Sequence, residues 1–363
     1  MKKSIGRISA LLMSAILFAG GCGQNAASGT TGNENSQTQQ SASTQDGANT
    51  SDDVAADGNA TNDDTANDNT TNDNTTNGDT ADGDNANGDV SDVDNEKHGP
   101  EIAGLTYKYA MNLTYATEFD VYYYEDGYKL LDVHEDKTYL VVPDGKDVPD
   151  GLDKDIVVLQ QPTDHIYMAA TAIMSLFDAM DALSNVKFSG VNSSGWYIED
   201  AKAAMEAGDM AYAGKYSEPD YETLINGDCN LAIESTMILH TPKVQEMIED
   251  LGIPVFVDYS SYETHPLGRT EWIKLYGAML NKEDEAKAFF DEQAQVIEKL
   301  KGFENTEKTV AYFYVNTDGS IVVRKSDDYI PSIIEIAGGR YVFKDLKNPD
   351  SNAPAVKLTM EEF

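Results

Sequence analysis

The chain has 363 residues and a formal net charge of −37 at pH 7, from 63 acidic and 26 basic side chains. A chain this acidic is poorly suited to bind nucleic acid or an anionic lipid surface, because both are negatively charged. It contains two cysteines, Cys22 and Cys229, without the Cys-x-x-Cys spacing of redox and zinc motifs.

The N-terminus has the pattern of a secretory signal. Three basic residues precede an apolar run at 8–18, which is shorter than the roughly 20 residues that a membrane-spanning helix needs. Small residues and then Cys22 follow, an order that resembles the lipobox of bacterial lipoproteins. The resemblance implies that 1–21 is a signal peptide and that Cys22 bears the lipid. An ordinary secretory signal with a chance cysteine is the alternative.

Residues 22–98 form a segment of different composition. From 23 to 98 there are 16 acidic residues and one lysine, and there is no Leu, Ile, Met or aromatic residue. Such a segment buries too little apolar surface to offset the entropy lost on ordering, so we expect a disordered acidic linker. Self-repulsion would extend it and hold the folded part away from the membrane.

A first α/β unit is predicted over 99–266. It begins with a Tyr- and Val-rich hairpin, after which strands alternate with helices, as in a largely parallel sheet. The predicted strands are 119–124, 128–133, 138–142, 155–159, one near 186, 210–213, 231–234 and 255–258. The predicted helices are 164–183, 198–207, 219–225 and 242–251.

A long helix is predicted over 267–302, where apolar residues recur at helical spacing, with Asn281 as a position for a break. The α/β alternation then restarts over 303–363, with strands at 310–315 and 321–323 and a helix at 330–337. Because this second unit has about 55 residues against about 160 in the first, we expect it to be incomplete. Two α/β lobes joined by one long helix imply a cleft, and clefts between domains are common ligand sites.

Three segments resemble class III substrate-binding proteins of ABC importers, the iron-siderophore, haem and cobalamin type. They are SEPDYETLINGDCNLAIES at 217–235, HPLGRTEWIKLYGAMLNKEDEA at 265–286 and DDYIPSIIEIAGGRYVF at 327–343, in that family's order. The resemblance implies two lobes on a rigid helix and a small-molecule metal chelate bound in the cleft. It also implies an ABC permease dimer as partner, a location outside the cell membrane and a monomer without a resident cofactor.

Ligand contacts are expected beyond the carboxyl ends of the strands, where α/β sheets bind ligands. Basic side chains there could counter an anionic chelate, and tyrosines could supply aromatic walls. The candidates are Gln161, Lys215, Tyr216, Ser217, Ser235, Tyr262, Arg269, Tyr314 and Arg324. Arg269 is the foremost candidate, because matching positions near the start of the family's long helix often face the cleft.

Two glutamates are candidates for docking to the permease. In the family one surface glutamate on each lobe binds an arginine pocket of the permease dimer. Glu222, in Pro219-Asp220-Tyr221-Glu222, matches the first-lobe motif, and Glu361, in Thr359-Met360-Glu361, matches the second. Both also lie near the start of a predicted helix, where the helix dipole favours acidic residues in any protein.

Two other functions compete with this interpretation. A zinc or manganese carrier could use His165, His240 and His265 with Glu234 or Glu263, because imidazole and carboxylate groups are ligands for these ions. An exported enzyme is the second alternative, but the sequence has no Gly-x-Ser-x-Gly, His-Glu-x-x-His or phosphate-loop motif. We therefore predict a binding protein rather than an enzyme.

Overall fold

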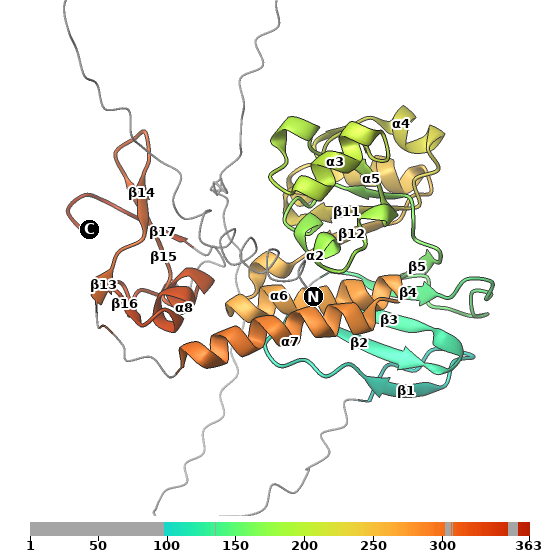
Figure 1. The fold of residues 1–363 in the computed structure, drawn as a ribbon, viewed down its shortest axis with the longest axis horizontal. Coiled ribbons are helices and arrows are strands. Elements are labelled where there is room, and N and C mark those ends of the chain that lie inside the picture. The colour runs from blue at the N-terminus through green and yellow to red at the C-terminus, as the bar shows by residue number, and fades with distance from the viewer. Residues whose placement is uncertain (1–97, 135, 302–305, 307, 348–354) are drawn as a thin grey trace, which may run out of the picture. The chain divides into compact units, whose positions relative to one another are not determined.

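The computed structural model describes residues 98–134, 136–301, 306, 308–347 and 355–363 (Figure 1). The predicted signal peptide, Cys22 and nearly all of the acidic linker lie outside these residues. Within the described part of the chain, no helix combines the length and the apolar character needed to cross a membrane.

The first five strands form one sheet in the order β1-β2-β3-β4-β5, antiparallel except for the parallel β4–β5 pair. They are β1 (Tyr107–Ala110), β2 (Phe119–Tyr124), β3 (Lys129–Val133), β4 (Thr138–Val142) and β5 (Ile156–Gln160). The predicted hairpin is confirmed. Its turn places Asp126 and Gly127 at positive φ, a conformation that glycine adopts freely and Asp tolerates better than most residues.

Both faces of this sheet are covered, which explains why its strands read as nearly continuous apolar runs. Phe119, Leu131 and Tyr139 belong to the main core. On the opposite face Tyr122 and Leu140 form a smaller core with other buried side chains. Because successive residues of a strand point to opposite faces, a strand buried on both sides needs apolar residues throughout.

The second sheet is parallel throughout, in the order β12-β11-β6-β7-β8. Its strands are β6 (Ile166–Met168), β7 (Val186–Ser189), β8 (Ala211–Tyr212), β11 (Leu231–Ser235) and β12 (Val255–Asp258). The helices between them are α2 (Met174–Ala179), α3 (Glu199–Ala207), α4 (Tyr221–Asn226) and α5 (Pro242–Asp250), and a hairpin of β9 (Gly214–Lys215) and β10 (Glu218–Pro219) precedes α4. The α/β class predicted from the sequence is confirmed.

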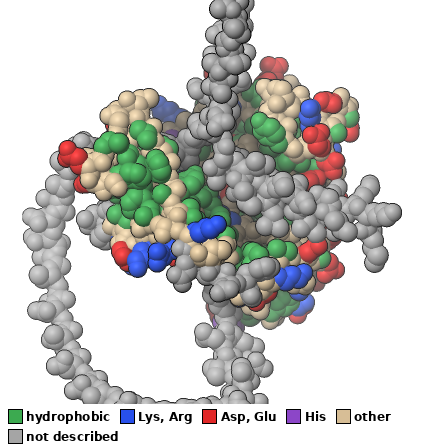
Figure 2. All heavy atoms as spheres, turned by 60° about the vertical axis from the view of Figure 1, so that its left-hand side comes forward, with side chains coloured by type: hydrophobic (Ala, Val, Ile, Leu, Met, Phe, Trp, Pro, Cys, Tyr) green, Lys and Arg blue, Asp and Glu red, His purple; other side chains and the backbone are tan. Residues whose placement is uncertain are grey.

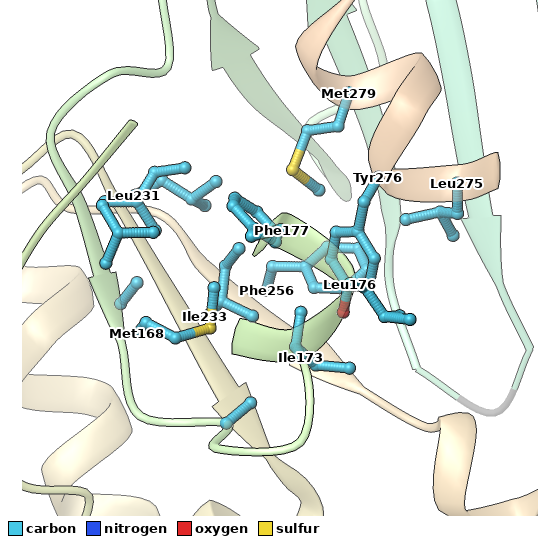
Figure 3. Close-up of a cluster of buried hydrophobic side chains, with 14 of the residues drawn as sticks. Met168, Ile173, Leu176, Phe177, Leu231, Ile233, Phe256, Leu275, Tyr276 and Met279 are labelled. Atoms are coloured by element: carbon cyan, nitrogen blue, oxygen red, sulfur yellow. The ribbon is translucent and has the colours of Figure 1, made fainter. Parts of the chain in front are cut away.

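The predicted helix over 164–183 is wrong. The segment holds strand β6, a turn at 169–173 and the short helix α2. β6 is only three residues long and completely buried, so alternation between apolar and polar positions could not reveal it. Met168, Ile233 and Phe256 belong to a buried cluster that also contains Phe177 of α2 and Tyr276 (Figure 3).

The long helix predicted over 267–302 is two helices, α6 (Pro266–Leu280) and α7 (Glu283–Leu300). Asn281, at φ 57°, ends α6 at the break position named from the sequence. The helices lie side by side (Figure 1), and Gly277 allows this because a Cβ there would stand 2.6 Å from the Cβ of Ala286. This segment is therefore a helical hairpin and not the one long helix that was predicted.

The second unit consists of short strands around one helix. These are β13 (Lys308–Val310), β14 (Phe313–Val315), β15 (Ile321–Arg324), α8 (Tyr329–Ile336), β16 (Gly339–Tyr341) and β17 (Ala355–Leu358). The predicted strand 310–315 is split into β13 and β14, and the predicted helix is present. Apolar side chains gather on the surface in Figure 2, and Phe313 and Val315 are among the exposed ones.

Candidate functional site

The carboxyl edge of the parallel sheet is the candidate site. The chain runs outward from β6 to β7 and β8, and then returns to the other side of β6 with β11 and β12. The connections after β6 and β11 therefore lead away in opposite directions, which opens a crevice in sheets of this kind. Residues 169–173 and Ser235 stand at this point.

Exposed tyrosines follow three of the five strands at this edge. Tyr197 comes after β7 and is 97% exposed, Tyr212 ends β8 and is 49% exposed, and Tyr262 comes after β12 and is 51% exposed. Trp196 is buried, and its indole N–H donates to Ser189 Oγ at 3.0 Å, so the loop that carries Tyr197 is anchored. Tyr197 was not among the residues predicted from the sequence, although an aromatic pair just before a helix was a visible signal.

Arg269 lies in the first turns of α6, next to the loop after β12. Its Nε donates to the backbone oxygen of Glu263 at 3.1 Å, and its Nη2 donates to the backbone oxygen of Ser261. Burial lowers the pKa of the guanidinium. The group remains a cation, since arginine starts from a pKa above 12.

The second unit meets Arg269 through the start of α8. The Arg269 guanidinium lies 3.5 Å from the ring centroid of Tyr329, a cation–π distance. Asp328 caps α8 by accepting from the Ile330 amide at 3.0 Å, and Arg324 Nη1 stands 4.0 Å from its carboxylate. Arg269 and Arg324 thus share this region with two carboxylates, Asp328 at the start of α8 and Asp258 at the end of β12.

Asp258, at the end of β12, supports the loop beside Arg269. Its carboxylate accepts from Ser260 Oγ at 2.6 Å and from the Tyr276 hydroxyl at 2.7 Å. Burial raises the pKa of Asp258 to about 6, and the hydrogen bonds from Ser260 and Tyr276 oppose the rise.

The other predicted contacts are spread along the edge. Lys215 ends β9, and Tyr216 and Ser217 form the turn of the β9–β10 hairpin that follows β8, at the edge opposite β12. Four strand spacings separate the edge strands, about 19 Å. Ser235 pairs with Asp258 in the register of β11 and β12. In the second unit, Tyr314 is 42% exposed on β14, and Arg324 is the residue near Arg269 described above.

Gln161 is a structural residue rather than a ligand contact. Its side chain is buried, its Nε2 donates to the Met279 backbone oxygen at 3.0 Å, and its Oε1 accepts from Asn281 at 3.0 Å. It follows β5, which belongs to the other sheet. The turn at 169–173 after β6, where Thr171 is exposed, takes the place that the sequence analysis assigned to Gln161.

The zinc or manganese alternative finds no support in the described part of the chain, where no group of three or more His, Cys, Asp or Glu side chains could hold a metal. His265 caps α6 through its Nδ1, and His165 Nδ1 lies 2.9 Å from Asp164. Of the carboxylates in this alternative, Glu263 accepts backbone amides, whereas Glu234 is buried and its oxygens have no hydrogen-bond partner among the described residues.

The predicted docking glutamates are both at the surface. Glu222 is exposed in the first turn of α4, which Asp220 caps by accepting from the Thr223 amide at 3.1 Å. Glu361 is exposed in the turn after β17, where the Thr359 amide donates to the Glu362 carboxylate and the Glu362 amide donates to Thr359 Oγ1, as in a helix capping box.

Comparison with known proteins gives one curated relative and a set of similar folds. No family model matches the chain. An uncharacterized lipoprotein of Methanocaldococcus jannaschii is 28% identical over 222 residues, which are 57% of this chain and 50% of the relative. The chain thus spans about half the length of the curated relative that it matches.

Solved structures with a similar fold include binding proteins of several bacteria. A possible iron-binding periplasmic solute-binding protein of Staphylococcus epidermidis is 16% identical, with a TM-score of 0.43, over 54% of this chain and 71% of that one. A periplasmic heme-binding protein of Vibrio cholerae is 19% identical, with a TM-score of 0.43, over 54% and 70%. A periplasmic binding protein of Veillonella parvula is 15% identical, with a TM-score of 0.47, over 60% and 71%. These identities and TM-scores show a similarity of general fold and do not indicate a shared ligand or partner.

Proposed function

We propose that the chain is the extracytoplasmic substrate-binding lipoprotein of an ABC importer and that it captures an anionic metal chelate of the ferric-siderophore type. Haem and cobalamin are the other ligands that the sequence resemblance admits. Lipid on Cys22 would anchor the protein to the outer face of the cell membrane.

One observation carries the proposal. Arg269 and Arg324 come together beside an edge of a parallel sheet that also exposes Tyr197, Tyr212 and Tyr262. Positive charge suits the anionic groups of a chelate, and aromatic rings suit its flat organic surfaces. The three sequence motifs in family order support the same function independently.

Tryptophan fluorescence offers a direct test, because the chain has two tryptophans in different surroundings. Trp196 lies beside the exposed Tyr197, whereas Trp272 is fully buried beneath Phe119. Ferric citrate, a ferric catecholate, haem and cyanocobalamin would each be titrated into the full-length protein. We expect saturable quenching by one of them that is largely lost in Trp196→Phe, while absence of binding by every probe would refute the proposal.

Arg269 itself is tested with the probe that binds. Loss of a charge-assisted hydrogen bond costs roughly 1.5 to 3 kcal/mol, or about tenfold or more in affinity. Arg269→Ala should therefore weaken an anionic chelate by at least this factor. Arg340→Ala, a change of an exposed arginine on β16, serves as the control and should leave the affinity unchanged.

Docking to the permease is proposed to use Glu222 and Glu361. Charge reversal at both positions should abolish uptake by cells while the purified protein binds its ligand as before, because like charges repel across a docking interface. Normal uptake by the double variant would exclude these two residues from docking.

A further inference from the structure

The connection between β1 and β2 holds two buried glutamates with consecutive backbone amides. The amides of Thr114, Tyr115 and Ala116 donate to the Glu271 carboxylate at 2.7 to 3.0 Å. The next two amides, of Thr117 and Glu118, donate to the Glu263 carboxylate at 2.9 to 3.0 Å. We call residues 113–118 the clamp loop.

The clamp loop lies directly on the first turns of α6. The ring of Tyr115 stacks on that of His265, with centroids 4.6 Å apart. Gly268 leaves room for this approach, because a Cβ there would stand 2.9 Å from Glu263 Oε2 and 3.1 Å from the Tyr115 backbone oxygen. Any side chain at position 268 would therefore push against both the loop and the glutamate.

Glu263 and Glu271 differ in what they hold besides the loop. Glu271 forms an ion pair with Lys274 at 2.6 Å, within α6. Glu263 accepts from the Trp272 indole at 3.0 Å, and its own backbone oxygen accepts from Arg269 Nε at 3.1 Å. The second acceptor of Arg269, the Ser261 backbone oxygen, lies two residues before Glu263 in the same short segment.

We propose that Glu263 is a positioning residue for Arg269. Its buried carboxylate, fixed by the clamp loop and Trp272, holds the 261–263 backbone so that two carbonyl oxygens direct the guanidinium. Glu263 has no need to touch a ligand in this role. The consequence for ligand affinity rests on the proposed function, whereas the positioning itself does not.

Arginine side-chain NMR tests the positioning without any ligand. The chain has four arginines, so the Nε–Hε spectrum is simple, and the Arg269 signal is identified by its loss in Arg269→Lys. Glu263→Gln should speed the exchange of the Arg269 Hε with water by about tenfold, because local opening sets exchange rates. Glu271→Gln, which loosens the same loop, should leave this rate within about twofold. Equal rates in the wild type and Glu263→Gln would overturn the proposal.

A second variant tests the same positioning in case Glu263→Gln does not fold. Gly268→Ala keeps the charge and instead displaces the Glu263 carboxylate by steric contact. It should also speed the Arg269 Hε exchange, and an unchanged rate in Gly268→Ala would contradict the proposal on its own.

A double-mutant cycle with the chelate that quenches Trp196 tests the consequence for binding. Glu263→Gln should weaken that chelate about tenfold in the wild type and leave its affinity unchanged in an Arg269→Lys background, since coupled residues are not additive. Equal weakening in both backgrounds would indicate a merely structural role and overturn the proposal. If Arg269→Lys itself binds like the wild type, the proposed ligand site fails, and the exchange rates still decide the role of Glu263.

Discussion

The part of the chain that the structure describes has two five-stranded sheets, and the polar groups of these sheets and their connections are used in different ways. In the β1–β5 sheet they hold α6 at both ends. The clamp loop binds two glutamates at the start of the helix, and Lys129 and Gln161 donate to the backbone oxygens of Ala278 and Met279 at its end. In the parallel sheet, tyrosines at the carboxyl edge are left at the surface.

We interpret this difference as the separation of a scaffold from the proposed recognition surface. A polar group that is buried and hydrogen-bonded fixes geometry and is costly to remove, whereas an exposed aromatic side chain contributes little to stability and remains available for contact. Changes in the first sheet should therefore alter stability first, and changes at the carboxyl edge should alter binding first.

Lys129→Met should produce the largest loss of stability. The Lys129 ammonium is buried and donates to Ala278 O at 2.8 Å and to Asn281 Oδ1 at 2.6 Å, beside Glu283. Methionine retains the volume but leaves the end of α6 without these donors, so we expect the free energy of unfolding to fall by about 3 kcal/mol in urea denaturation. Lys108→Met, on exposed β1, is the control and should change it by less than about 0.5 kcal/mol. Similar losses in both variants would refute the scaffold role.

Lys129 also illustrates what the sequence could not reveal about the fold. Local patterns were sufficient for the β2–β3 hairpin, the α/β alternation and the break at Asn281. They could not show that Lys129 binds the end of a helix 149 residues further along, nor that the two helices fold back on each other. Such contacts depend on tertiary packing, which no local periodicity encodes.

The position of a candidate residue in the fold could be predicted from a long element but not beside a short one. Arg269 was placed near the start of a strongly periodic helix, and it lies in the first turns of α6 with its guanidinium over the Tyr329 ring. Gln161 was assigned wrongly because β6 was missed, so β5 was taken for a strand of the parallel sheet. Glu263 was considered as a metal ligand, since nothing in the sequence shows the amides of the clamp loop that bind it.

Glu234→Gln should raise the free energy of unfolding in a pH-dependent manner. It tests a buried polar group of the parallel sheet, for comparison with those of the β1–β5 sheet. Glu234, on β11, is fully buried, and neither carboxyl oxygen has a hydrogen-bond partner among the described residues. Burial raises its pKa well above the usual value, and the titratable groups facing it are the phenols of Tyr167 and Tyr221. The folded state therefore retains a proton that the unfolded chain releases above about pH 4.3.

The sign of the expected effect follows from this retained proton. The wild type carries no ionisation penalty below the unfolded pKa and loses stability as pH rises above it, by at most about 1.4 kcal/mol per pH unit. Glutamine does not titrate, so the stability of Glu234→Gln relative to the wild type should increase from pH 5 to pH 7. Urea denaturation at both pH values measures this, and a difference that is constant with pH would show that Glu234 is not buried in its neutral form.

Tyr197→Ala should have the smallest effect on stability and a clear one on binding. Because Tyr197 is 97% exposed, its removal should change the free energy of unfolding by no more than about 0.5 kcal/mol. Loss of an aromatic contact should weaken the chelate that quenches Trp196 by about fivefold, or about 1 kcal/mol. Tyr109→Ala is the matched control, because Tyr109 is 52% exposed on β1 and stacks on Tyr123 at 4.6 Å, so it should lose stability without losing affinity. An equal loss of affinity in both variants would mean that the position of an exposed tyrosine does not affect binding. The carboxyl edge would then be excluded as the specific recognition surface.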